Sequence, residues 1–326
     1  MWWRRSFLAG LIINWLIVFS GNALWSEEAI QKKKVDLQWS GFSQFQLDYF
    51  QNNTNTFRLR RVRVGLKVET PAGWQMKIQI DPTLTKALLD LKLSLNFTPE
   101  VTLHLGQFKI PFSRESLTSS SQLELINLSR VVSLLSPGRD NKAKGRDIGL
   151  VLQGKFSSFE GYVGLFNGAG INRQDDNSQK DLAARWLWSP SKKIGLGYSY
   201  YQGQPNLITE ESTVKKIRND VEAWWQTERF LLQGEWLWGS RQEIKSEGGY
   251  LLGGYDVVAK RLRVVVRLEK INLDKSRTSD DLQVFSFGLT WFFQGRSKLQ
   301  INYEIHRERE IEVKNNIWLA QLQVGF

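Results

Sequence analysis

The stretch "LLDLKLSLNF", residues 88–97, alternates between apolar and polar side chains. Leu91 and Leu93 fall on one face of an extended chain, and Asp90 and Lys92 fall on the other. A period of two is that of a β-strand whose two faces meet different surroundings. The same alternation recurs in "WQMKIQI" (74–80), "RLRVVVRLEK" (261–270) and "KLQINYEIH" (298–306).

Segments of this kind follow one another along most of the chain, and sixteen of them are predicted. They lie at 36–50, 56–70, 73–81, 86–97, 100–108, 146–156, 158–168, 180–189, 192–203, 215–228, 229–241, 248–259, 260–271, 281–294, 296–308 and 316–326. An even number of strands is what a closed bacterial outer-membrane barrel requires.

The connections between the segments alternate in length. Those after even-numbered segments are short, as in "TPAG", "FTPE" and "SPSK". Those after odd-numbered segments are mostly longer and polar, as in "GAGINRQDDNSQ" and "QGQPNLITEEST". Short periplasmic turns and longer outer loops are typical of membrane barrels. A soluble β-sandwich or a propeller has no need of this asymmetry.

The polarity of the two faces indicates which one points inward. Packing the many ionic side chains into a dry core would be costly, whereas a water-filled lumen removes that cost. The apolar face then meets lipid, where every backbone group must be paired within a closed sheet. The last segment, "IWLAQLQVGF" (317–326), also alternates and ends on Phe326. We therefore predict an all-β, 16-stranded antiparallel transmembrane β-barrel.

The first residues are typical of an export signal. "MWWRR" is a positive start, "FLAGLIINWLIVFS" is an apolar stretch, and Gly21 and Ala23 are small residues before a cleavage point. We predict a signal peptide over residues 1–23 and a barrel domain over 24–326, in the bacterial outer membrane. The alternative is an uncleaved N-terminal anchor.

Composition excludes several classes of site. The 326 residues include 44 Lys and Arg against 33 Asp and Glu, two histidines and no cysteine. Disulfides, thiolate catalysis and cysteine metal sites are excluded, and a histidine-rich metal site is not expected. We predict no cofactor and no metal. The exported compartment also makes nucleic acid an unsuitable partner, although the chain is basic.

The longest interruption of the strand pattern is residues 109–145. Ser121 and Glu124 form a capping-box pair, and apolar residues then recur at helical spacing until Pro137. We predict a short amphipathic helix here, in a loop folded into the lumen to constrict it; the alternative is a loop outside the barrel. Its basic residues are Lys109, Arg114, Arg130, Arg139, Lys142 and Lys144.

The stretch "FRLRRVRVGLKVET", residues 57–70, concentrates positive charge on one predicted strand. By parity with the lipid-facing valines, Arg58 and Arg60 are expected near the outer rim. Rings of arginine and lysine in a lumen select anions, and arginine offers a planar fork to oxyanions. The predicted pore-lining cations are Arg61, Arg63, Lys67, Lys77, Lys92, Arg185, Arg261, Arg263 and Arg267. The alternative is that each merely solvates a wet wall, balanced by acids such as Glu222 and Glu235.

Several stretches resemble one known family. They are "TFRLRRVRVGLKVETPAGWQMKIQID" (56–81), "GQFKIPFSRE" (106–115), "GRDIGLVLQGKF" (145–156) and "YVGLFNGAG" (162–170). These resemble the phosphate-selective porin O/P family of bacterial outer membranes. The resemblance implies a 16-stranded barrel, usually a homotrimer, whose loop after the fifth strand enters the pore. It also implies an anion path lined by arginines and lysines.

The sequence thus predicts a water-filled, anion-preferring diffusion channel for phosphate or related oxyanions. Its expected partners are small inorganic or organic anions, membrane lipid and further copies of itself. One alternative is a general or structural outer-membrane barrel without phosphate selectivity. A barrel enzyme is the other, but no G-x-S-x-G motif and no Ser/His/Asp constellation is found in the sequence.

Overall fold

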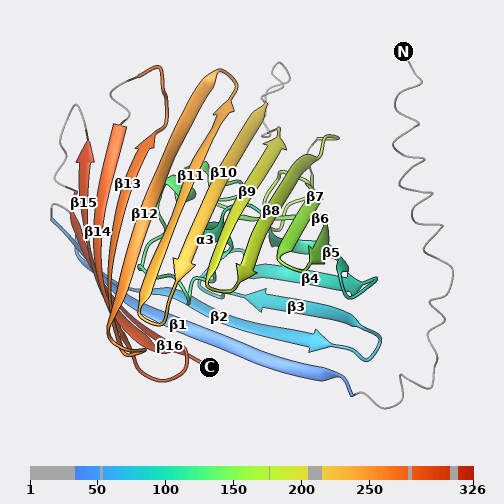
Figure 1. The fold of residues 1–326 in the computed structure, drawn as a ribbon, viewed down its shortest axis with the longest axis horizontal. Coiled ribbons are helices and arrows are strands. Elements are labelled where there is room, and N and C mark those ends of the chain that lie inside the picture. The colour runs from blue at the N-terminus through green and yellow to red at the C-terminus, as the bar shows by residue number, and fades with distance from the viewer. Residues whose placement is uncertain (1–33, 52–53, 176, 205–214, 278–280, 309–314) are drawn as a thin grey trace.

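The computed structural model describes residues 34–51, 54–175, 177–204, 215–277, 281–308 and 315–326. The predicted signal peptide, residues 1–23, lies outside these described residues. The chain forms a closed barrel of sixteen antiparallel strands, in which each strand pairs with its neighbours in sequence and β1 pairs with β16 (Figure 1). The predicted fold class is confirmed.

The strands follow the predicted segments closely. Their bounds are β1 (Asp36–Phe50), β2 (Thr56–Glu69), β3 (Trp74–Ile80), β4 (Leu88–Asn96), β5 (Val101–Lys109), β6 (Arg146–Phe156), β7 (Phe159–Phe166), β8 (Asp181–Ser191), β9 (Ile194–Gly203), β10 (Lys216–Gln226), β11 (Phe230–Arg241), β12 (Ile244–Val258), β13 (Leu262–Asn272), β14 (Asp281–Phe292), β15 (Lys298–Glu308) and β16 (Ile317–Gly325).

The two faces of the wall have the polarity expected of a membrane barrel. On β14, Leu289 and Trp291 are 42% and 55% exposed, whereas Ser286 and Thr290 are almost completely buried. The outer surface is therefore apolar and the buried face polar, the reverse of a water-soluble protein. No helix among the described residues combines the length and the apolar character needed to cross a bilayer.

The seam between β1 and β16 closes the barrel. The Gly41 amide donates to the Phe326 carbonyl at 3.2 Å, and the Phe326 amide donates to the Gly41 carbonyl at 3.0 Å. A side chain at Gly41 would meet the Phe326 ring, because a Cβ there would lie 2.7 Å from its Cζ. Further along the seam, the side-chain Nε2 of Gln44 donates to the side-chain oxygen of Gln323 at 2.7 Å.

Four irregularities of register occur among the described strands, and two of them, on β2 and β4, change the side on which predicted residues lie. On β2, Arg61 pairs with Gln44 and Leu59 pairs with Phe45, so that Arg60 is an extra residue. On β4, Leu89 is extra in the same way and is fully buried, although alternation predicts a lipid-facing position. Such β-bulges insert one residue into a strand and reverse the parity of what precedes it.

The segment between β5 and β6 carries two short helices, α3 (Arg114–Leu117) and α4 (Arg130–Leu135). The prediction that a helix begins at Ser121 is wrong, because α4 begins after Ser129, whose hydroxyl accepts from the Val132 amide. Residues 121–128 instead bond to the barrel wall. The Ile126 amide donates to the Asn302 side chain at 2.7 Å, which replaces a helical hydrogen bond.

Helix α4 packs on the buried faces of β11, β12 and β13. Val131, Val132 and Leu135 join one apolar cluster with wall residues that include Leu237 and Val265. The wall is therefore apolar where α4 docks and polar elsewhere on the same face. Gly248 of β12 permits the close approach, since a Cβ there would lie 3.0 Å from Val131 Cγ2 and 2.7 Å from the Lys270 carbonyl oxygen.

Candidate functional site: a basic path along the inner wall

All four arginines of β2 turn toward the buried face. Arg63 contacts Asp81 at 3.1 Å, and Arg61 donates to the Gln44 side chain at 2.8 Å. The expectation that Arg58 and Arg60 share the side of the lipid-facing valines is wrong. Arg58 forms an ion pair of 2.9 Å with the buried Asp48, and Arg60 donates to Gln46 and Asn127. The β-bulge at Arg60 is the reason, because it shifts the parity of the preceding residues.

A cavity of about 470 Å³ lies against strands β2–β8 and the segment after β5. We call it the basic cavity. Its charged lining consists of Arg63, Lys77, Lys92, Lys109, Arg146 and Arg185 with the single carboxylate Asp90, as far as the described residues extend. Arg146, the first residue of β6, was not predicted as a site residue. Two cations share the Asp90 carboxylate: Arg146 contacts it at 2.6 Å and Lys77 at 3.0 Å.

Three lysines stand side by side across this wall. In the barrel register Lys67 lies opposite Lys77, and Lys77 lies opposite Lys92. Lys67 is paired with Glu69 and Lys77 with Asp90, but Lys92 forms no ion pair with any described residue. Like charges directly opposite one another destabilise a sheet unless something compensates them. The row is therefore suited to attracting an anion.

A second cavity, of about 710 Å³, lies at the end of the barrel that carries the long connections. We call it the loop-end cavity. Its cationic lining is Lys86, Lys142, Lys144, Arg173, Lys216 and Arg241, and its acidic lining is Asp140 and Asp181. Burial, and then the neighbouring charges of Arg61 and Arg63, lower the pKa of Lys144. Lys144 therefore lines the loop-end cavity and also interacts electrostatically with the β2 arginines. One of these arginines, Arg63, lines the basic cavity.

The predicted cations of β8 and β13 have other surroundings. Arg185 is buried and paired with Glu222 at 2.5 Å. Arg263 is held between Glu124 at 2.9 Å and Asp256 at 2.5 Å. The prediction that Arg261 lines the wall is wrong, because it lies exposed in the turn that precedes β13. The strand begins at Leu262, so parity counted from its apolar residues does not reach this position.

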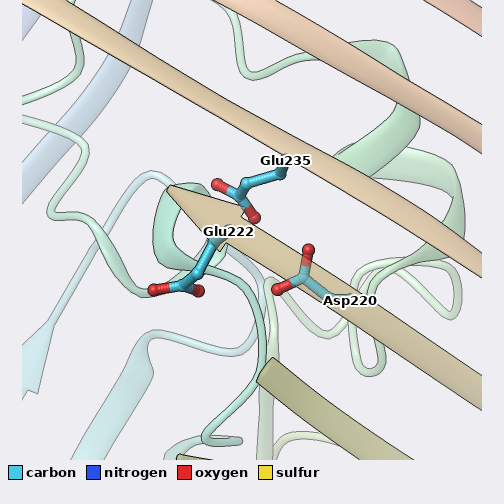
Figure 2. A group of neighbouring side chains, drawn as sticks. All are labelled: Asp220, Glu222 and Glu235. Atoms are coloured by element: carbon cyan, nitrogen blue, oxygen red, sulfur yellow. The ribbon is translucent and has the colours of Figure 1, made fainter. Parts of the chain in front are cut away.

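An acidic cluster lies beside Arg185 on the next part of the wall. Asp220, Glu222 and Glu235 lie next to one another on β10 and β11, and a carboxylate oxygen of each lies within 4.8 Å of the others (Figure 2). The register pairs Glu222 directly with Glu235. The sequence identified Glu222 and Glu235 as balancing charges. It could not show that they are neighbours, because alternation does not give the register between strands.

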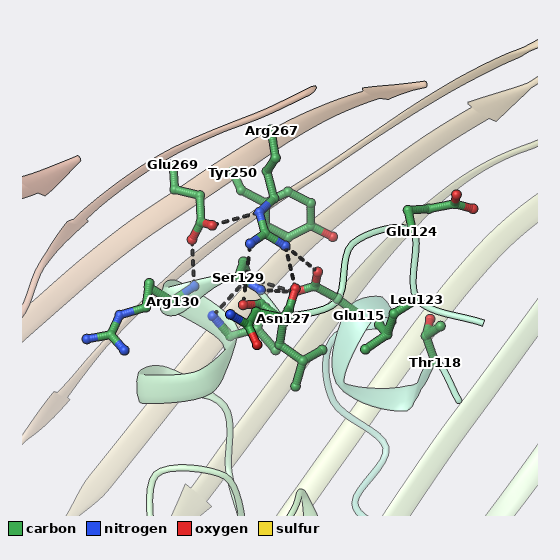
Figure 3. A network of polar contacts seen from close by, with 12 residues as sticks. Glu115, Thr118, Leu123, Glu124, Asn127, Ser129, Arg130, Tyr250, Arg267 and Glu269 are labelled. Carbon is green, nitrogen blue, oxygen red and sulfur yellow. Dashed lines mark hydrogen bonds and ion pairs between the residues drawn. The ribbon is translucent and has the colours of Figure 1, made fainter. Parts of the chain in front are cut away.

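A network of polar contacts joins α3 and α4 to β13 (Figure 3). Glu115 accepts from the Ser129 amide at 2.9 Å and from its hydroxyl at 2.7 Å, and lies 3.3 Å from Arg267. Arg267 also pairs with Glu269 at 2.7 Å, and Glu269 accepts from the Arg130 amide at 2.5 Å. Arg267 lies on the buried face, as parity predicts. Its charge is paired with Glu115 and Glu269 and so helps to hold this segment against the wall.

The cations of the segment itself differ in what they contact. Lys109 donates to the carbonyls of Ser116, Leu117 and Thr118 at 2.8–2.9 Å, at the negative end of α3. The Arg114 guanidinium lies 4.1 Å from the centre of the Trp224 ring. Arg130 and Lys142 are exposed.

Arg139 lies close to the positive charge of Arg146. It donates to the Ser116 hydroxyl and carbonyl, both at 2.7 Å. Burial, and then the charge of Arg146, lower the pKa of Arg139 to about 10. Asp81, at the end of β3, provides local compensation. Although burial opposes ionisation there, hydrogen bonds from Thr83 and Arg63 lower the pKa of its carboxyl group.

Solved structures share this barrel at low sequence identity. An anion-selective porin from Comamonas acidovorans has a TM-score of 0.69 at 11% identity, over 90% of this chain and 100% of that one. The trimer form of OmpT, an outer membrane protein of Vibrio cholerae, has a TM-score of 0.67 at 12%, with coverage of 90% and 100%. The outer membrane channel DcaP of Acinetobacter baumannii has 0.64 at 14%, with 90% and 98%. At such identities the likeness shows the fold alone.

The closed 16-stranded wall, apolar outside and polar inside, defines a porin of the bacterial outer membrane. Residues 34–212, more than half of the chain, match the family model described as phosphate-selective porin O and P. The chain belongs to that family. No curated protein matches it significantly in sequence.

Proposed function

We propose that this porin is a water-filled diffusion channel that prefers anions, with phosphate and related oxyanions as its solutes. The observation that carries the proposal is the composition of the basic cavity, which has six cationic side chains and one carboxylate among its described lining residues. Like charges lining a channel with low-dielectric walls focus the field on a permeating ion. Arginine adds a planar fork of donors that matches the oxygens of phosphate.

The path would begin at the loop-end cavity and pass the β2 arginines. Lys144 lines the former, and Arg63 lines the basic cavity below it. Lys92, which lines the basic cavity, and Arg61, which donates to Gln44, form no ion pair with any described residue, so both charges are available to an incoming anion. A series of partly free cations lets an anion bind weakly at each step and leave again, which conduction requires.

Residues 109–145 would set the width of the channel. Support comes from their contacts with widely separated strands of the wall. The Glu115 amide donates to Glu235 of β11 at 2.7 Å, and the Arg63 guanidinium of β2 donates to Ser120 at 3.3 Å. Lys298 of β15 donates to the Leu123 carbonyl at 2.7 Å. A segment bonded to opposite walls leaves less room for solute beside it.

We further propose that the chain is exported with cleavage of residues 1–23 and that it assembles as a homotrimer. The trimer form of OmpT supports the second point by analogy of fold. A channel rather than an enzymatic function is favoured by the family. Cross-linking of the detergent-extracted barrel should give a species of three chains, and a monomer alone would contradict the assembly proposed.

Ion selectivity in planar bilayers tests the central proposal. In a KCl gradient the reversal potential should have the sign of chloride preference. Millimolar phosphate should then reduce the chloride current, because the oxyanion occupies the same cationic path. Cation preference, or no conductance by correctly folded barrels, would rule out the proposal. Chloride preference without any phosphate block would instead support the general porin without phosphate selectivity.

A further inference from the structure

Asp220, Glu222 and Glu235 form an acidic cluster on the buried faces of β10 and β11 (Figure 2). Asp220 and Glu222 are fully buried, and Glu235 is 4% exposed. Three carboxylates this close cannot all remain charged at low cost in a poorly solvated place. Arg185 is the one cation that forms an ion pair with them among the described residues, through Glu222. Two of the three carboxylates therefore have no ion-pair partner among the described residues.

The hydrogen bonding of the three groups follows a single pattern. Glu235 uses Oε1 to accept from the Glu115 amide and from the Tyr250 hydroxyl, both at 2.7 Å. Glu222 uses Oε1 for Arg185, and Asp220 uses Oδ2 for a long contact of 3.5 Å with Ser199. The second oxygen of each carboxylate is buried and has no hydrogen-bond partner.

From these two observations we propose that the cluster is a divalent cation site and that its preferred ion is Ca²⁺. Each carboxylate is oriented through one oxygen and offers the other, as ligating carboxylates do when outer partners fix them. Oxygen-only donors select a hard cation, not a thiophilic or imidazole-seeking one. Two ligand oxygens on opposite sides of a Ca²⁺ ion lie about 5 Å apart, which suits oxygens that all lie within 4.8 Å of one another.

The ion would tie together β10, β11 and the start of the segment after β5. Glu235 would bind it through Oε2 while holding the Glu115 amide through Oε1. The site borders the basic cavity through Arg185, which lines that cavity and pairs with Glu222. The competing account is that protons shared among the carboxylates supply the missing charge.

Terbium luminescence on the refolded full-length barrel tests the proposal. Trp224 lies two residues beyond Glu222, and Tyr250 bonds to Glu235, so either ring can sensitise a bound Tb³⁺ ion. We expect one Tb³⁺ per chain, displaced by Ca²⁺. Asp220→Asn should weaken Tb³⁺ binding more than tenfold. The matched control is Asp256→Asn, a buried wall carboxylate already paired with Arg263, which should bind Tb³⁺ as the wild type does.

Folding is checked by the gel shift of the unheated barrel and by circular dichroism. If Asp220→Asn fails to fold, Glu235→Gln is measured in its place, together with Ca²⁺ displacement on the wild type. Folded wild-type barrels without sensitised emission would overturn the proposal, as would equal binding by the folded cluster variant and the control. Either result would leave proton sharing as the source of charge balance, without affecting the anion channel proposed above.

Discussion

Lys77 of β3 lies directly opposite Lys92 of β4 in the barrel register, and only the first of them has a carboxylate partner, Asp90. The charge of Lys92, which has no carboxylate partner among the described residues, is therefore available to a solute anion. The pair also shows how a channel can place cations close together and remain folded, because Asp90 and Arg146 stabilise one side of the row.

Charge reversal at the unpaired cations should change ion selectivity. Arg61→Glu and Lys92→Glu are each expected to lower the chloride-to-potassium permeability ratio by at least about fivefold, since the reversal changes the charge by two units and one unit charge at 4 Å is worth about 1 kcal/mol even in water. Reversal potentials in a KCl gradient measure the effect. Arg261→Glu is the matched control, because that residue is exposed in a turn, and it should leave the ratio unchanged. If all three variants changed the permeability ratio equally, the ratio would depend on the net charge of the protein and not on the position of the substituted residue.

Alkaline pH should weaken anion preference earlier than an ordinary lysine would allow. Burial and the charges of Arg61 and Arg63 lower the pKa of Lys144 below its usual value of 10.5. The cation is therefore lost as the pH rises through the lowered pKa. Reversal potentials between pH 7 and about 10 should decline. In Lys144→Arg the charge persists, so the decline should be smaller; identical curves would contradict a role for Lys144.

The contacts of Glu115 should restrain the segment between β5 and β6. Glu115→Gln removes the charge that faces Arg267 and weakens the bonds to Ser129, at a cost of about 3 kcal/mol for a broken buried ion pair. We expect a lower unfolding temperature and more frequent fluctuations of single-channel current. Glu247→Gln, which removes an exposed pair with Lys275, is the control and should change stability little. If the single-channel current of Glu115→Gln fluctuated no more than that of the wild type, the remaining contacts would be sufficient to hold the segment in place.

Gly248 is expected to tolerate no side chain. An alanine methyl group would lie 2.7 Å from the Lys270 carbonyl oxygen and 3.0 Å from Val131 of α4. Gly248→Ala should therefore cost about 1–3 kcal/mol, the usual penalty of overpacking. Denaturant unfolding of the refolded barrel measures the cost. Gly253→Ala on the same strand is the control, because nothing lies within 4 Å of its Cβ position, and an equal loss there would implicate strand propensity instead.

The alternation of apolar and polar residues predicted much of this architecture. It predicted the sixteen strands and the inward positions of Arg63, Lys77 and Lys92, because these depend only on a period of two. It failed at the bulges of Arg60 and Leu89, where an extra residue reverses parity without any mark in the local pattern. Arg58 and Arg60 were misplaced for this reason.

Contacts between distant segments were also beyond the sequence. That Glu222 faces Glu235 depends on the register of β10 and β11, and that Glu115 meets Arg267 depends on how a segment crosses to β13. The helix expected from Ser121 gave way to bonds with Asn302 and other wall groups, an example of tertiary structure overriding local propensity. Arg146 stood in a quoted motif, but its pairing with Asp90 was visible only once β4, β5 and β6 were assembled.

The seam between β1 and β16 has a consequence for biogenesis. Gln44 and Gln323, which bond across it, are 279 positions apart, so the ring closes only when both ends of this chain have reached the same place. Until then two strand edges are open, and open edges invite pairing with other chains. Contacts so distant in sequence also form slowly. The protein should therefore depend on periplasmic chaperones and on a membrane insertase that shields both edges until Gly41 meets Phe326.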